Sequence, residues 1–516
     1  MTSELSKKLA ESLEELKKLQ DDGIIAIKSD ELSRVDRERL LKSGFLKKVA
    51  KGWYIPVPPD EKPGDTTSWY ASYWSFCSRY FFDYGEEYII SPDQSIEIHT
   101  GNWTVPQQLI IRTPIKANYE TKLPYNTFIW HWETPIPATA NIVVIEGIRM
   151  MDLPSSLVYC TPAVFTKNPT DVRIALAMIK DSSDILKQLL EGGHTTIAGR
   201  LAGAFRNIGK DKIADEIIKA MQAAGYNAIE TNPFTDKAQV VLSLKEISPY
   251  VNRIKLMWDE MREVVIKYFP KSKGLPVDTE KYMQDVADIY VTDAYHSLSI
   301  ERYRVTPELI ERVRSGSWDA RNNEEDGKQK NAMAARGYWQ ATQKVRESIK
   351  KILDGKNPGA VCDAEHGDWY RELFAPSVTA GMLKASDLAG YRNHQVYIGG
   401  SKHVPMNKDA VRDAMPALFE FLENEKEASV RAVLGHFIFV FIHPYMDGNG
   451  RMGRFLLNAM LASGGYPWTV IPVEQRNIYM EALEEASVER NIEPFAKFLA
   501  YLVDEAMKGR PVAKIN

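Results

Sequence analysis

A short polar segment between two apolar stretches carries the residues best suited to chemistry. Its sequence, from His443 to Arg454, is HPYMDGNGRMGR. His443 titrates near neutrality and can accept a proton from an incoming hydroxyl. Asp447 is a hard oxygen ligand of the kind that Mg²⁺ takes beside phosphates. Arg451 and Arg454 lie one helical turn apart and offer guanidinium groups that match phosphate oxygens. Together these residues predict a site that holds a polyphosphate with a metal ion and transfers part of it.

The flanking segments indicate how this loop is held. Residues 437–442 are uninterruptedly apolar, and residues 455–462 are apolar at helical spacing, so we expect two buried helices. Gly448 and Gly450 lack a Cβ and let backbone N–H groups approach a phosphate. A helix that begins near Asn449 would direct its free N–H groups and its dipole at the same anion. The alternative is a polar turn between two helices with surface arginines. It accounts for any one of these residues, but not for all of them together at these positions.

The segment resembles the signature of the Fic family, H-x-F-x-D/E-G-N-G-R-x-x-R, with Tyr445 where the family usually has Phe. The resemblance implies transfer of AMP from ATP, with Mg²⁺, onto a hydroxyl side chain of a target protein. It also implies the roles of individual residues: His443 as the base, Asp447 as the Mg²⁺ ligand, Gly448, Asn449 and Gly450 as the phosphate cradle, and Arg451 and Arg454 at the β/γ end. Tyr479, in the segment Arg476-x-x-Tyr479, resembles the end of the family's nucleotide pocket.

A second segment, from Ser297 to Glu301, resembles the inhibitory motif of the same family, S/T-x-x-x-E-G/N. The resemblance implies that Glu301 pairs with Arg454 and blocks productive binding of the γ-phosphate. Ser297 and Glu301 are four residues apart and share a face of the helix expected over 286–300. Arg302 departs from the motif: a small residue would end the helix, whereas arginine would continue it or compete for Glu301. The alternative is a glutamate that caps the helix and has only a structural role.

Residues 391–405 alternate in polarity, contain Gly399-Gly400 and end at a proline, which predicts a β-hairpin. This hairpin resembles the flap of the Fic family, whose edge holds the target protein by strand addition. An ordinary surface hairpin is the alternative.

The first 60 residues have a different pattern. Ser29 and Ser33 are placed to cap two short helices, the second over 34–42, and residues 45–56 predict a hairpin that turns near Gly52. Helices followed by a basic hairpin are typical of a winged helix. Positions 28–51 hold eight basic and four acidic residues. The arrangement resembles AbiEi-type antitoxins and leaves DNA binding open against a structural or protein-docking role.

The domain organisation follows from these segments. Strand-like pieces at 87–90, 107–112 and 141–145 precede helical patterns after Pro169, and the stretch 196–234 also resembles AbiEi proteins. We expect a multidomain α+β chain: a winged helix at 1–60, a mixed α/β domain at 61–245, a connecting segment at 246–276, and an all-α Fic domain with a β-hairpin flap at 277–516.

Composition narrows the class of protein. The chain has 516 residues, 44% of them hydrophobic, and a formal charge of −4, which gives no general case for nucleic-acid binding. Three cysteines far apart argue against a disulfide framework or a zinc site and fit a reducing cytoplasm. No signal-peptide core or apolar run long enough for a membrane span is expected.

Three hypotheses for function follow. The first is an ATP- and Mg²⁺-dependent protein adenylyltransferase that Glu301 inhibits. The second is a toxin–antitoxin-like regulator that binds DNA and uses its Fic part as a sensor or effector. The third keeps the fold but changes the chemistry to phosphorylation, another nucleotidyl donor or removal of AMP. The target protein and a homo-oligomeric state are left open.

Overall fold

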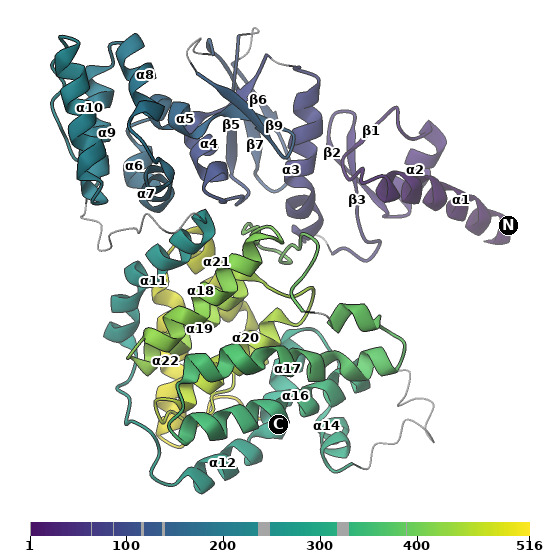
Figure 1. The fold of residues 1–516 in the computed structure, drawn as a ribbon. Helices are drawn as coiled ribbons and strands as arrows, with labels where there is room; N and C mark the ends of the chain where they lie inside the picture. The colour runs from purple at the N-terminus through teal and green to yellow at the C-terminus, as the bar shows by residue number, and fades with distance from the viewer. Residues whose placement is uncertain are drawn as a thin grey trace. The chain divides into compact units, whose positions relative to one another are not determined.

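The computed structural model describes residues 2–62, 64–85, 87–114, 118–136, 140–235, 248–316, 330–388 and 390–515. Their contacts divide the chain into two compact units (Figure 1). The first unit contains Met1–Pro249 together with Tyr397–Val404, and the second contains Tyr250–Val396 and Pro405–Asn516. The predicted boundary at 245/246 lies outside the described residues, and the division of the first unit at residue 60 stays a prediction.

The N-terminal part of the first unit has the predicted succession of a helix and a hairpin. Its elements are α1 (Thr2–Asp21), β1 (Ile27–Lys28), α2 (Arg34–Lys42), β2 (Leu46–Ala50) and β3 (Trp53–Pro56), in a sheet of order β1-β3-β2. Ser33 caps α2, since its side chain accepts a hydrogen bond from the N–H of Asp36. The hairpin turns at Gly52, whose φ is 79°, as predicted. The helix expected after Ser29 is wrong: residues 29–32 form turns, and the Glu31 N–H bonds to the Lys28 carbonyl.

The rest of the first unit combines small sheets with helices. The strands are β4 (Ile89–Ile90), β5 (Gln108–Thr113), β6 (Tyr119–Lys122), β7 (Phe128–Glu133), β8 (Ile142–Ile145) and β9 (Ile148–Met151). They form a sheet of order β4-β5-β7-β6, in which β5 and β7 are parallel, and a β8-β9 hairpin. The three strands predicted from the sequence are confirmed. The helices are α3 (Thr67–Phe82), α4 (Pro92–His99), α5 (Leu153–Tyr159), α6 (Val164–Lys167), α7 (Pro169–Met178), α8 (Ser183–Glu191), α9 (Thr195–Asn207) and α10 (Asp211–Ala223).

In the described residues of the second unit, every regular element is a helix. The α-helices are α11 (Pro249–Tyr268), α12 (Thr279–Asp288), α13 (Tyr290–Ile300), α14 (Pro307–Arg314), α16 (Lys330–Leu353), α17 (Pro358–Thr379), α18 (Ala410–Asn424), α19 (Ala428–Ile442), α20 (Asn449–Ala462), α21 (Arg476–Val488) and α22 (Glu493–Met507). Two 3₁₀ turns, η1 (Ala385–Leu388) and η2 (Val473–Gln475), complete the set. Thr306 caps α14 ahead of Pro307, as the sequence predicts.

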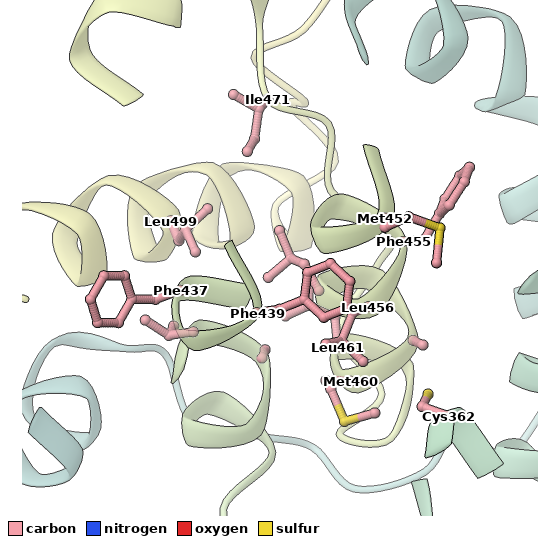
Figure 2. Close-up of a cluster of buried hydrophobic side chains, with 14 of the residues drawn as sticks. Cys362, Phe437, Phe439, Met452, Phe455, Leu456, Met460, Leu461, Ile471 and Leu499 are labelled. Atoms are coloured by element: carbon pink, nitrogen blue, oxygen red, sulfur yellow. The ribbon is translucent and has the colours of Figure 1, made fainter. Parts of the chain in front are cut away.

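The core of the second unit is built around α19 and α20. Figure 2 shows Phe437 and Phe439 of α19 in one cluster with Met452 and Leu456 of α20, and all four side chains are buried. The apolar face of α11 also belongs to this core. The polar loop, residues 443–448, lies between α19 and α20. Because both helices are buried, packing holds the loop at its two ends.

The segment 391–405 corrects one prediction. It turns at Gly400 but contains no strand, so the β-hairpin flap is wrong in this conformation. At the turn the Ser401 N–H donates to the Ile398 carbonyl at 3.1 Å, but other backbone groups of the segment bond outside it. The Gly400 N–H donates to Thr67 Oγ1 at 3.0 Å, and the Lys402 carbonyl accepts from the Val105 N–H at 3.0 Å. Val404 is buried in the aromatic core of the first unit.

All three cysteines, Cys77, Cys160 and Cys362, are buried and free. In the part of the chain that the structure describes, no helix combines the length and the apolar character needed to cross a lipid bilayer.

Candidate active site

The polar loop is closed by the side chain of Asn449. Its Nδ2 donates to the Tyr445 carbonyl at 2.8 Å, and its Oδ1 accepts from the Tyr445 N–H at 2.9 Å. Gly448, with φ 82°, is the N-cap of α20, so the helix begins at Asn449 as predicted. Asn449 is 2% exposed, and its side-chain oxygen and one of its two amide N–H groups bind the loop.

Packing explains two other loop positions. Tyr445 is buried and stacks on Tyr370, with ring centroids 3.8 Å apart and planes at 7°. A Cβ on Gly448 would lie 2.8 Å from the Phe374 ring, so this position needs glycine for space as well as for its positive φ. The loop therefore has little freedom to move away from α17, which carries Tyr370 and Phe374.

His443 is half-buried and ends α19 in a left-handed conformation, with φ 55° and ψ 59°. Its Nδ1 lies 3.1 Å from the Val440 carbonyl. Because a carbonyl only accepts, Nδ1 carries the hydrogen and Nε2 is left as the basic nitrogen. Burial lowers the pKa of His443 to about 4, although the Val440 carbonyl opposes this shift. At neutral pH the imidazole is therefore unprotonated, as a general base requires.

Arg451 and Arg454, in the first turns of α20, are 1% and 3% exposed. The Arg451 guanidinium lies over the rings of Tyr303 and Phe374, at 5.2 and 5.0 Å from their centroids. Among the described residues, Arg451 Nε and Arg454 Nη1 are buried without a hydrogen-bond partner. Unsatisfied buried donors are costly, and an anion at the start of α20 would satisfy them.

Asp447 fits Mg²⁺ as a single protein ligand. Its side chain is 68% exposed, and Oδ2 makes only a long 3.4 Å contact with Arg451. Its Oδ1 accepts from the Gly448 N–H at 2.6 Å, which orients the carboxylate. Within the described ranges, no group of three or more His, Cys, Asp or Glu side chains is arranged to hold a metal. A Mg²⁺ ion here would take its remaining ligands from phosphates and water.

Glu301 and Ser297, both from the end of α13, bind Arg454. Arg454 Nη2 donates to Glu301 Oε1 at 2.7 Å, and Arg454 Nε donates to Ser297 Oγ at 2.7 Å. A Cβ on Gly450 would lie 2.3 Å from Glu301 Oε1, so the carboxylate lies against the start of α20. Burial alone would raise the pKa of Glu301, but Arg454 and Arg451 outweigh it and hold this pKa below its usual value. The carboxylate therefore stays ionised against the start of α20.

Arg302 does not continue α13. Its φ is 65°, and the helix ends with hydrogen bonds from the Arg302 N–H to the Ser299 carbonyl and from the Tyr303 N–H to the Leu298 carbonyl. The expectation that arginine would extend the helix is wrong, because the turn adopts the left-handed conformation that Gly or Asn favours. In the described structure, the guanidinium that holds Glu301 is that of Arg454.

Tyr479, on α21, is 2% exposed and lies in the core. Its hydroxyl lies 2.8 Å from Nε2 of His436, which is itself fully buried. Burial raises the pKa of Tyr479, and the nearby charge of Arg454 opposes this rise. The side chains of Tyr479 and Arg454 are therefore close. Its predicted role at the nucleotide stays a prediction, and this position favours support of Arg454 over direct contact with a ligand.

Sequence reasoning did not find three residues that shape the site. Tyr303 and Phe374 enclose Arg451. Arg392 binds the backbone of the loop, because its Nε donates to the His443 carbonyl at 2.8 Å. These residues are distant from the loop in sequence, and no spacing rule connects them with it. Arg392 lies in the segment 391–405, whose pattern suggested only a hairpin.

Comparison with known proteins identifies the domain. Residues 367–461 match the model of the Fic/DOC family. Protein adenylyltransferase Fic of Drosophila yakuba and that of Drosophila willistoni are each 37% identical over 121 residues, which is 23% of this chain and 24% of theirs. The chain thus spans about a quarter of the length of these relatives. The solved structure of Fic-1 from C. elegans covers 66% of this chain and 96% of its own, at 16% identity and a TM-score of 0.37. The match to the family model identifies a Fic domain at residues 367–461.

Proposed function

We propose that this chain is a protein adenylyltransferase, which moves AMP from ATP to a hydroxyl side chain of a target protein. One observation carries the proposal: among the described residues, buried guanidinium nitrogens of Arg451 and Arg454 lack partners at the start of α20, and the loop that leads into this helix begins with the neutral imidazole of His443. A triphosphate would satisfy these donors, and the imidazole would activate the acceptor. The similarity to proteins named adenylyltransferase supports the same assignment.

The transfer is an in-line displacement. Nε2 of His443 accepts the proton of the attacking hydroxyl while its oxygen bonds to the α-phosphorus of ATP. The bond between that phosphorus and the bridging oxygen breaks, and pyrophosphate leaves. The N–H groups at the start of α20, with Arg451 and Arg454, stabilise the charge on the phosphates. Asp447 would hold Mg²⁺, which neutralises charge on the leaving group.

The pairing of Glu301 with Arg454 supports autoinhibition. The carboxylate uses one donor of Arg454 and lies against Gly450, where the phosphates would bind. ATP must therefore displace Glu301 or bind in a strained position, because two anions cannot share this guanidinium without repulsion. Ser297 holds Arg454 from the same helix and keeps it available to Glu301.

Labelled ATP tests the proposal. Wild type, Glu301→Gln, and Glu301→Gln combined with His443→Ala are incubated with Mg²⁺ and ATP labelled at either the α- or the γ-phosphate. We expect α-label on protein, most with Glu301→Gln and none after His443→Ala. Glu308→Gln, an exposed carboxylate on α14, is the matched control and should behave as wild type. Protein that acquires only γ-label is a kinase product, and absence of both labels contradicts nucleotidyl transfer.

A second candidate, DNA binding by residues 1–60, rests on three exposed lysines. Lys42 of α2, Lys48 of β2 and Lys51 of the turn make no ion pair among the described residues. Two other basic residues are used within the fold: Arg37 donates to backbone carbonyls, including that of Ser29, and Lys47 pairs with Glu61. Charge reversal of the three lysines should abolish salt-dependent retention on DNA. Reversal of Lys356, which is exposed and also has no ion pair among the described residues, is the control, and no retention by wild type at low salt removes this candidate.

A further inference from the structure

The left-handed turn at His443 must be held by its surroundings. Its φ of 55° and ψ of 59° cost a residue with a Cβ about 1–2 kcal/mol relative to the usual helical conformation. Such a conformation persists only where neighbouring groups determine it. The loop that follows is fixed by Asn449, but the hydrogen bonds of that side chain within the loop go to Tyr445 and not to His443.

A buried arginine binds the turn from the other side. Arg392 is 1% exposed, and its Nε donates to the His443 carbonyl at 2.8 Å. Its backbone N–H donates to the Pro444 carbonyl at 2.9 Å, and its Nη2 lies 3.5 Å from the Ile442 carbonyl. One residue therefore reaches the three consecutive carbonyls through which the chain leaves α19.

The remaining contacts fix Arg392 itself. Nη1 donates to the His394 carbonyl at 3.1 Å, and Nη2 donates to the Met406 carbonyl. In the described structure, all its side-chain hydrogen bonds thus go to backbone carbonyls. Burial lowers the pKa of Arg392 to about 10, so the guanidinium stays charged at neutral pH. A cation at the C-terminal end of α19 is also favoured by the helix dipole.

We propose that Arg392 is a positioning residue for the transfer reaction, which holds the left-handed turn that aims the imidazole of His443 at the anion site. This inference rests on the proposed function. Among the described residues, the carbonyls that the Arg392 side chain binds belong to the turn and to its own segment, and none belongs to α20, which carries Arg451 and Arg454. Its planar fork is needed because the carbonyls that it reaches lie in different directions, and the ammonium of lysine cannot bind them all with fixed geometry.

The charge of Arg392 supplies a readout that packing alone would not change. Burial is the largest cause of the low pKa of His443, and the positive charge of Arg392 lowers this pKa further. The Val440 carbonyl and the carboxylates of Glu301 and Asp447 act in the opposite direction. Removal of this charge should raise the pKa of His443 toward the ordinary value. The acid limb of the pH–rate profile should then move to higher pH.

The test uses the full chain with Glu301→Gln as the parent. Arg392→Gln should lower kcat by about 100-fold while KM for ATP changes by less than about 2-fold, because the base is misplaced and the phosphate site is intact. Arg392→Lys should recover part of kcat and return the acid limb toward the parent. Arg412→Gln is the matched control, because Arg412 donates to Asn393 and to the Lys408 carbonyl but does not reach the turn. Its kinetics should equal those of the parent.

Two kinetic results would overturn the proposal. One is an unchanged kcat in a folded Arg392→Gln protein. The other is a joint fall of kcat, ATP affinity and melting temperature with no movement of the acid limb, which indicates a purely structural role. A parent that transfers no label disproves the proposed function instead. The NMR titration of His443 in the parent and in Arg392→Gln gives an independent check: a higher pKa of His443 in the variant supports the proposal, and identical curves refute it.

Discussion

Glu301 and Arg454 lie 153 residues apart in the chain and are joined by a 2.7 Å hydrogen bond from Nη2 to Oε1. Ser297 occupies Nε of the same guanidinium, and Nη1 is left without a partner among the described residues. A single buried arginine is thus shared between an internal carboxylate and any phosphate that binds at α20. Its internal contacts should therefore set both the stability of the site and its affinity for nucleotide.

The hydroxyl of Ser297 should stabilise Arg454. Ser297→Ala leaves the buried Nε of Arg454 without an acceptor and should lower the free energy of unfolding by about 1–3 kcal/mol. Because the guanidinium loses one of its anchors on α13, nucleotide affinity should rise at the same time. Chemical denaturation and ATP titration measure the two effects, with Ser315→Ala, an exposed serine after α14, as the control. Equal stability of Ser297→Ala and wild type would contradict the assigned hydrogen bond.

Arg302 should be strained, and its removal should stabilise the end of α13. Arg302→Gly relieves about 1–2 kcal/mol of left-handed strain, partly offset by about 0.4–1 kcal/mol of extra chain entropy in the unfolded state. The substitution also removes the repulsion between Arg302 and Arg476. Burial is the larger cause of the lowered pKa of Arg476, and the charge of Arg302 lowers it further. The unfolding free energy should rise by roughly 0.5–1 kcal/mol. Arg304→Gly, at a position without positive φ, should instead destabilise the protein.

The two hydrogen bonds from Asn449 should hold the loop closed. Asn449→Ala leaves the buried N–H and carbonyl of Tyr445 without partners, and should cost roughly 2–4 kcal/mol of unfolding free energy. Label transfer should fall because the start of α20 is no longer ordered. Differential scanning calorimetry gives the first quantity. Asn424→Ala, which removes one exposed hydrogen bond to the Glu420 carbonyl, serves for comparison and should change the melting temperature little.

The stability of the protein should depend on pH because of the titration of Asp293. This residue is buried on α13 and accepts a hydrogen bond from Tyr338 at 2.6 Å. Burial raises the pKa of Asp293 to about 6. The folded state therefore binds the proton more tightly than the unfolded state, whose pKa is near 3.9. The stability that this group contributes is present below about pH 4 and is lost as the pH rises through about 6.

Asp293→Asn should remove this dependence. The variant should gain about 1–3 kcal/mol over wild type at about pH 7.5, because it buries no charge, and much less at about pH 4. Urea denaturation at both values measures the difference. Asp288→Asn, at an exposed site at the end of α12, should give equal changes at the two pH values. A gain that does not depend on pH would show that Asp293 is not protonated in this window.

The polar loop shows what local sequence can predict. The start of α20 at Asn449, the caps at Ser33 and Thr306, and the turn at Gly52 were all predictable. Each depends on backbone conformation and on hydrogen bonds within a few residues, which side-chain type controls directly. Residue type alone suggested that His443 could accept a proton, and the resemblance of the loop to a known signature added the transfer of AMP.

Tertiary structure decided the contacts between segments that are distant along the chain. The segment 391–405 has the composition of a hairpin, yet the backbone groups of Arg392, Gly400 and Lys402 bond to other segments, and that outcome depends on the partners available after folding. Tyr479 has a helical position in the sequence, but only packing against His436 turns it into the core. The alignment of Arg392 with the carbonyl of His443 likewise exists only in the folded chain. A spacing rule describes neighbours within one element, whereas these geometries result from the packing of separate elements.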